Sequence, residues 1–252
     1  MQRSIAPTMP ITITTTTPIP TTMSEPLSRS LALLQLASPA LPVGAFSYSE
    51  AIETLVDKGR VRSAADLTDW LRQELRVGSI RLEAAALLKA RQAIEQGDRD
   101  SIHHWNQWIS ALRETEELRL QSWQMGRSLV TLAKDLNPTD AALVALNLQP
   151  VNYAIAFASL AAHWQLSHAE MLTAYLQSWA SNLVSAGVRS IPIGQTQGQQ
   201  TLLNLWPDLT AAIAEIQQLA TADTDDDWFV CGWGLSIASM IHETQYSRLF
   251  RS

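Results

Sequence analysis

Helical periodicity constrains the fold of this chain more than any other feature of its sequence. From residue 27 onward, small or apolar residues recur at spacings of three and four, which places them on one face of an α-helix. Two such faces are Leu118, Ser122, Met125, Leu129, Leu132 and Leu136, and Leu172, Leu176, Trp179, Leu183 and Ala186. No alternating series of strand type and no repeat of fixed period accompanies them. We therefore expect an all-α, single-domain helical bundle of about nine or ten helices.

Capping residues and turn residues set the expected helix bounds. Serine followed three residues later by glutamate has capping-box spacing at Ser47 and Glu50 and again at Ser167 and Glu170. Gly59, Gly78 and Gly97 are expected at helix ends or interruptions. One helix is expected to begin at residue 63 or 66 and to end at residue 77, residues 101–136 are expected to form two helices, and residues 201–219 one or two, with Pro207 at a junction. The other expected helices cover residues 31–36, 47–58, 80–95, 139–146, 151–164 and 167–189, and a last helix follows residue 234. Arg113 and Glu117 are predicted to form a pair on the surface, one turn apart.

The first residues differ in composition from the rest. Residues 1–26 are rich in Thr and Pro and lack the apolar core of a secretory signal, so we expect a disordered extension before an all-helical domain over residues 27–252. Met23 is an alternative start. No run is long enough to span a membrane, and the single cysteine, Cys231, fits a reducing compartment, so a cytoplasmic location is expected.

Charge argues against some partners and for others. The formal net charge of −6 argues against a nucleic-acid partner, because proteins that bind nucleic acid usually present a basic face. Fifteen of the eighteen basic residues are arginine, whose planar guanidinium suits fixed contacts with other proteins.

Motifs that would carry catalysis are missing or incomplete. Residues 194–198 contain two glycines without the Lys-Ser/Thr pair of a phosphate loop, so the chain is not expected to hydrolyse nucleotides. His242 and Glu243 begin a zinc-protease-like pattern, but Tyr246 stands at the second histidine position. We expect no catalytic residues, no bound cofactor and no metal site. An alternative is a magnesium-dependent diphosphate enzyme using Asp223, Asp225, Asp226 and Asp227, although a run of like charges is usually a solvated loop.

The last eleven residues, 242–252, combine acid, base, amide, hydroxyl and two aromatic rings. This mixture suits an interface, because tyrosine and arginine often anchor buried contacts. The alternative is a C-terminal helix docked on its own domain. If the segment is an interface, its removal should leave the core folded, because the main apolar faces lie upstream.

Four blocks of sequence, occurring in the same order, resemble the UreF family of urease accessory proteins. They are residues 38–49 (SPALPVGAFSYS), 113–119 with 124–129, 183–199 (LVSAGVRSIPIGQTQGQ) and the tail 242–252. The resemblance extends from about Leu31 to Ser252. One departure is visible: Glu50-Ala51 stands where the family usually has a small or polar residue followed by glycine.

The resemblance implies a non-catalytic, all-helical, dimeric urease maturation chaperone. Such proteins bridge UreD, also called UreH, and the GTPase UreG, and the assembly delivers nickel to apo-urease. The residues expected at partner interfaces are Pro42, Gly44, Phe46, Tyr48, Glu50, Arg189, Gln195, Gln197, His242, Glu243, Gln245, Tyr246, Arg248 and Phe250. Trp179, Leu183 and Gly187 are expected to pack in a homodimer. Arg189 as a helix cap, Glu50 as half of a capping box, and Phe46 and Tyr48 as core aromatics remain structural alternatives. A generic helical scaffold for another assembly is the rival function.

Overall fold

The computed structural model describes residues 25–136, 148–222 and 228–252. These residues form ten α-helices and one short 3-10 helix, and no strand occurs among them, which confirms the all-α prediction. The elements are α1 (Glu25–Leu36), η1 (Ala45–Ser47), α2 (Ile52–Asp57), α3 (Ala64–Val77), α4 (Ser79–Gln96), α5 (Arg99–Leu112), α6 (Glu116–Leu136), α8 (Tyr153–His163), α9 (His168–Ser190), α10 (Gln195–Thr221) and α11 (Trp233–Glu243). The predicted helix 139–146 and the acidic run 223–227 lie outside the described residues.

Most helix ends follow the local signals in the sequence. Ser63 caps α3 by accepting a hydrogen bond from the N–H of Asp66. Ser167 and Glu170 form a complete capping box at the start of α9. Gly59 and Gly97 both have positive φ, as expected of residues that follow a helix.

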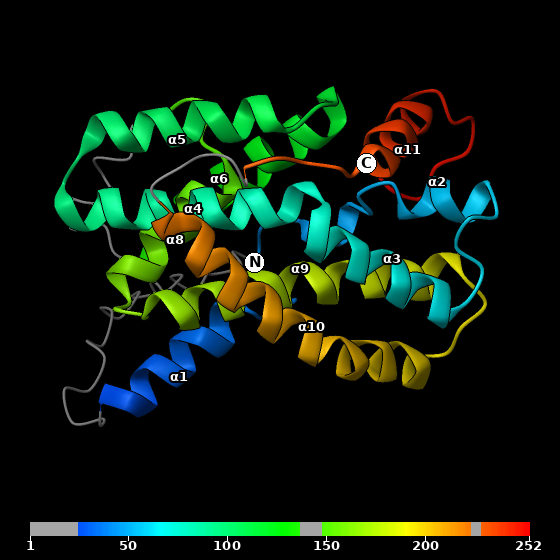
Figure 1. Ribbon diagram of the computed structural model, residues 1–252, viewed down its shortest axis with the longest axis horizontal. Coiled ribbons are helices and arrows are strands. Elements are labelled where there is room, and N and C mark those ends of the chain that lie inside the picture. Colours follow the sequence, from blue (N-terminus) through cyan, green and yellow to red (C-terminus); the bar gives the residue numbers. More distant parts are fainter. Residues whose placement is uncertain (1–24, 137–147, 223–227) are drawn as a thin grey trace, which may run out of the picture.

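The core is centred on α4 and α8 (Figure 1), which pack against each other while α6 covers α8 and α5 covers α4. Every residue of α8 from Tyr153 to Ala161 is buried. Gly126 in α6 allows a close approach to the residues that precede α8, since a Cβ there would lie 2.3 Å from the carbonyl oxygen of Val151.

A second layer consists of α9 and α10, and α3 packs against α10 (Figure 1). All five predicted core positions of α9 are buried. Gly187 faces Leu67 of α3, where a Cβ would lie 2.4 Å from a methyl carbon. The close helix contact at Gly187 is thus made within one chain. None of the helices in the described ranges combines the length and apolar character needed to cross a membrane.

Several expectations about local structure are wrong. The Ser47–Glu50 capping box does not form, because Glu50 and Ala51 both adopt positive φ and α2 begins only at Ile52. Pro207 does not separate two helices but lies inside the continuous helix α10. The extension was predicted to end at residue 26, whereas α1 already begins at Glu25.

Candidate functional site

The C-terminal segment 244–252 is not helical and runs back along α2. Its backbone is held by Glu53 of α2, whose carboxylate accepts the N–H groups of Leu249 at 2.6 Å and Phe250 at 3.1 Å. The N–H and the hydroxyl of Ser49 both donate to the carbonyl oxygen of Ser252 at 2.7 Å. These contacts fix the segment against the rest of the chain. Together with the last two residues of α11 it makes up residues 242–252, which we call the tail.

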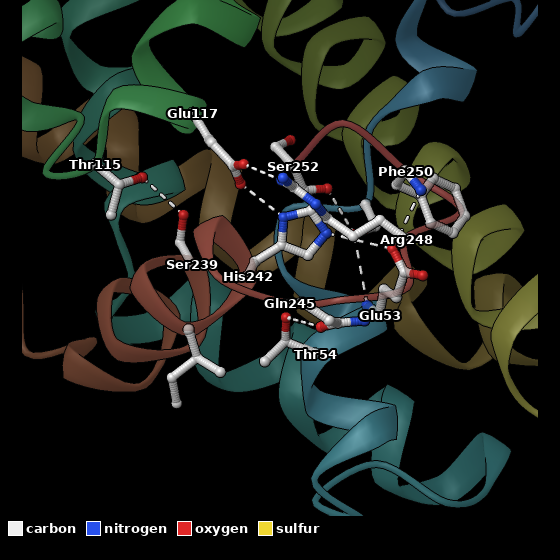
Figure 2. A network of polar contacts seen from close by, with 12 residues as sticks. Glu53, Thr54, Thr115, Glu117, Ser239, His242, Gln245, Arg248, Phe250 and Ser252 are labelled. Atoms are coloured by element: carbon white, nitrogen blue, oxygen red, sulfur yellow. Dashed lines mark hydrogen bonds and ion pairs between the residues drawn. The ribbon is translucent and has the colours of Figure 1, made fainter.

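A buried histidine joins the tail to two helices (Figure 2). His242, at the end of α11, is fully buried. Its Nδ1 lies 2.6 Å from a carboxylate oxygen of Glu117 in α6, and its Nε2 lies 3.3 Å from Glu53. Arg248 of the tail pairs with the second oxygen of Glu117. The imidazole thus lies between two carboxylates and the guanidinium pairs with one of them, which links α2, α6, α11 and the tail.

Neutral hydrogen bonds surround this charged cluster. The hydroxyls of Thr115 and Ser239 lie 2.7 Å apart, and Thr54 donates to the side-chain oxygen of Gln245 at 3.0 Å (Figure 2). Removing the tail would therefore leave buried polar groups on α2 and α6 without partners, which carries a free-energy cost. These contacts argue against the expectation that the tail can be removed without affecting the core, and thermal unfolding of the truncated chain tests that expectation.

Arg189, at the end of α9, contacts both η1 and the tail, so it connects three segments that contain predicted interface residues. Its Nη2 donates to the carbonyl oxygen of Phe46 at 2.8 Å, and its guanidinium carbon lies 4.2 Å from the centre of the Phe250 ring. The N–H of Arg251 donates to the carbonyl oxygen of Ser47 at 2.9 Å. The residues around η1, the end of α9 and the tail therefore form one continuous surface, which we call the tail surface.

Buried charges lie below this surface. Glu50 accepts hydrogen bonds from the amide of Gln121 and the indole of Trp179, both at 3.1 Å. Burial raises the pKa of Glu50, and Arg113, 3.9 Å away, opposes that rise. Arg113 is buried and pairs with Glu83 at 2.5 Å, so the predicted surface pair between Arg113 and Glu117 does not form.

The predicted interface residues fall into three groups. Exposed residues at the tail surface are Pro42, Phe46, Arg189, Glu243, Tyr246 and Arg248, with Gly44 and Gln245 partly exposed. Buried residues, which support the surface from within, are Tyr48, Glu50, His242 and Phe250. Gln195 and Gln197 are exposed at the start of α10, where Gln197 accepts the N–H of Gly194, and no described contact joins them to the tail.

The residues predicted to pack in a dimer lie in the core of a single chain. Trp179 and Leu183 are buried, and Gly187 faces Leu67 of the same chain. Helical periodicity identified a buried face correctly, and within this chain Gly187 is covered by α3 while Trp179 contacts Glu50.

An apolar face of α11 was missed in the sequence. Trp233, Ile237, Met240 and Ile241 are exposed on the outer side of this helix, and the exposed Leu249 follows in the tail. Their spacing of three and four places them on one face of α11. Because the inner face of this helix is apolar too, the hydrophobic periodicity of the sequence could not distinguish the outer face from the inner one. The outer face and the tail surface offer large apolar side chains bordered by arginine, which is the composition of a protein interface.

The described residues contain no group of three or more His, Cys, Asp or Glu side chains arranged to hold a metal ion. The aspartates of the alternative enzyme hypothesis lie outside the described residues.

Comparison with known proteins agrees with the motifs. A family model described as UreF matches residues 61–206. The urease accessory protein UreF of Trichormus variabilis is 53% identical over 222 residues, covering 88% of this chain and 95% of that protein. The UreF of Microcystis aeruginosa is 54% identical, covering 88% and 97% of the two chains, and that of Azoarcus sp. is 40% identical, covering 88% and 95%. The chain therefore belongs to the UreF family of urease accessory proteins.

Proposed function

We propose that this protein is a non-catalytic adaptor in urease maturation, which joins UreD (UreH) to the GTPase UreG during GTP-dependent nickel insertion into apo-urease. The observation that carries the proposal is the convergence of η1, the end of α9 and the tail around Arg189. Membership in the UreF family supports a role in urease maturation, and the tail surface is the proposed binding site for a partner.

The tail surface is suited to binding because it is held in place before a partner arrives. Tyr246 is fully exposed, Leu249 is 74% exposed and Phe46 is 68% exposed. The backbone beside them is fixed by Glu53 and Ser49. Ordering these side chains on binding therefore costs less conformational entropy than ordering a free peptide would.

Nickel is the cargo of the proposed assembly rather than a resident of this chain. We propose that the adaptor positions UreG and couples its nucleotide state to partner contacts, with a coupling free energy of about 1–3 kcal/mol, as is typical of allosteric systems. Purified alone, the protein is then expected neither to hydrolyse GTP nor to bind nickel tightly. Calorimetry with nickel, and GTP turnover assays on the isolated chain, test both expectations.

A homodimer in the cytoplasm remains part of the proposal. Because Trp179, Leu183 and Gly187 are buried in one chain, another surface has to form the dimer contact. Light scattering of the purified chain tests this point, since a monomeric mass at high concentration contradicts a dimer.

Co-purification with UreD and UreG, with masses from light scattering, tests the bridging function. The proposal expects one complex that contains all three proteins and requires this chain for its assembly. Tyr246→Ala and Arg248→Ala should each weaken the complex, and Arg251→Ala should matter less. Assembly of UreD with UreG in the absence of this chain would contradict bridging and favour a generic scaffold.

A further inference from the structure

An open groove of about 520 Å³ lies between α3 and α10. It is lined by Ala65, Thr68, Asp69, Arg72, Leu203, Asn204 and Pro207. None of these residues belongs to α11 or the tail, and Figure 1 shows α10 and α11 on opposite sides of α3. The groove is thus separate from the tail surface.

On α10, Leu203 lines the groove and the exposed Trp206 stands beside it, next to an unusual backbone position. Leu203 is 47% exposed, and Trp206, three residues further along the helix, is 57% exposed. Pro207 has no N–H, so the carbonyl oxygen of Leu203 has no donor four residues later. The groove itself therefore offers an aliphatic anchor and a backbone acceptor, and an aromatic anchor lies at its edge within the same turn of α10.

The α3 wall carries a fixed acidic charge. The guanidinium Nε of Arg72 donates to both carboxylate oxygens of Asp208 at 3.0 Å, and its Nη1 donates to Asp69 at 2.8 Å. One cation therefore serves two carboxylates, so these three side chains together carry one net negative charge. The side chain of Asp69 is 73% exposed, so this charge is presented to solvent.

We propose that the groove between α3 and α10 docks an amphipathic helix of a partner protein that carries Lys or Arg beside its apolar face. The apolar side chains of that helix would contact Leu203 and Trp206, in the helix-in-groove mode of recognition. Tryptophan is among the residues that contribute most to binding free energy. The basic side chain would face Asp69, because the rim attracts positive charge and repels acidic helices.

A synthetic helical peptide with Leu at positions i, i+4 and i+7 and Lys on the flanking positions probes this chemistry directly. Hydrogen exchange of the full chain, with and without the peptide, should show slower exchange over residues 199–210. Trp206→Ala and Asp69→Lys should each weaken peptide binding at least tenfold. A peptide with Glu in place of Lys should bind at least tenfold more weakly.

Matched variants keep this test separate from the proposed adaptor function. Trp233→Ala makes the same truncation on the outer face of α11 and should leave peptide binding unchanged, as should Tyr246→Ala in the tail. As a folding control, circular dichroism and thermal melting of Trp206→Ala should match those of the wild type. Unchanged exchange over residues 199–210, or equal affinity of the wild type and Trp206→Ala, would overturn the groove proposal, whatever UreD does at the tail.

Discussion

At the scale of single residues, Glu74 of α3 is a buried acid, with 6% of its surface exposed. Burial raises its pKa from 4.5 to about 8, the charge of Glu50 adds to the rise, and Arg113 opposes it. The folded chain therefore binds a proton here that the unfolded chain releases above pH 4.5. Stability should fall as the pH rises from about 5 to 8, by about 3–5 kcal/mol from this group.

Glu74→Gln removes this titration. The variant should be more stable than the wild type at pH 8 and should differ little from it at pH 5. Urea unfolding at pH 5, 6.5 and 8 measures the difference, with the exposed Glu114→Gln as a control. Parallel stability curves for the wild type and Glu74→Gln would show that the carboxyl group stays ionised in the fold.

Glu53 is the residue on which the tail depends most directly. It accepts two backbone N–H groups of the tail and contacts the imidazole of His242. Glu53→Gln replaces one acceptor oxygen by a donor, so we expect a loss of about 1.5–3 kcal/mol. Faster hydrogen exchange over residues 244–252 would report the release of the tail. The control is Asp57→Asn, an exposed change in the same helix, and equal exchange in the two variants would contradict the role given to Glu53.

At the scale of helices, the close packing of α9 against α3 depends on a glycine. At Gly187 a Cβ would lie 2.4 Å from a methyl carbon of Leu67. Gly187→Ala should destabilise the fold by about 1–3 kcal/mol through overpacking, although alanine favours helix by about 1 kcal/mol. Gly194→Ala, where no atom lies within 4 Å of the added Cβ, is the control. Thermal unfolding compares the two, and equal melting temperatures would show that α3 and α9 separate easily.

Helix bounds could be predicted because their signals are local. Ser63, Ser167 and Gly97 act on residues within four positions, and the buried face of α9 follows from period alone. On α6 the period is right as far as Leu129, whereas Leu132 is partly buried and Leu136 is exposed. The conformation around Glu50 could not be predicted in this way, because its side chain bonds to residues 71 and 129 positions away. The same holds for Arg113, whose partner Glu83 lies on another helix.

The departure at Glu50-Ala51 also has a structural explanation. Ala51 has a φ of 63° and is fully buried, so the position favours the glycine that the family usually has there. The departure thus lies at a position with an unusual backbone conformation: the chain turns here, so that Glu50 points into the core.

At the scale of the whole molecule, the tail combines two roles that the sequence presented as alternatives. His242, Phe250 and Ser252 are buried and contribute to the fold, whereas Tyr246, Arg248 and Leu249 are exposed. Residues from η1, α9 and the tail were all predicted at the interface, and the structure brings them together around Arg189. The outer face of α11 and the groove beside α3 were not predicted, because exposure depends on which helices lie next to each other.

The most direct test of this account compares folding with binding in single-residue variants of the tail. Thermal unfolding and the Kd for UreD should be measured for the wild type, Tyr246→Ala and Leu249→Ala, with Leu120→Ala on α6 as an exposed control. We expect unchanged melting temperatures in all variants, and binding weaker by about 1–3 kcal/mol for Tyr246→Ala and Leu249→Ala only. Wild-type affinity for UreD in both tail variants would contradict the claim that the tail surface binds this partner.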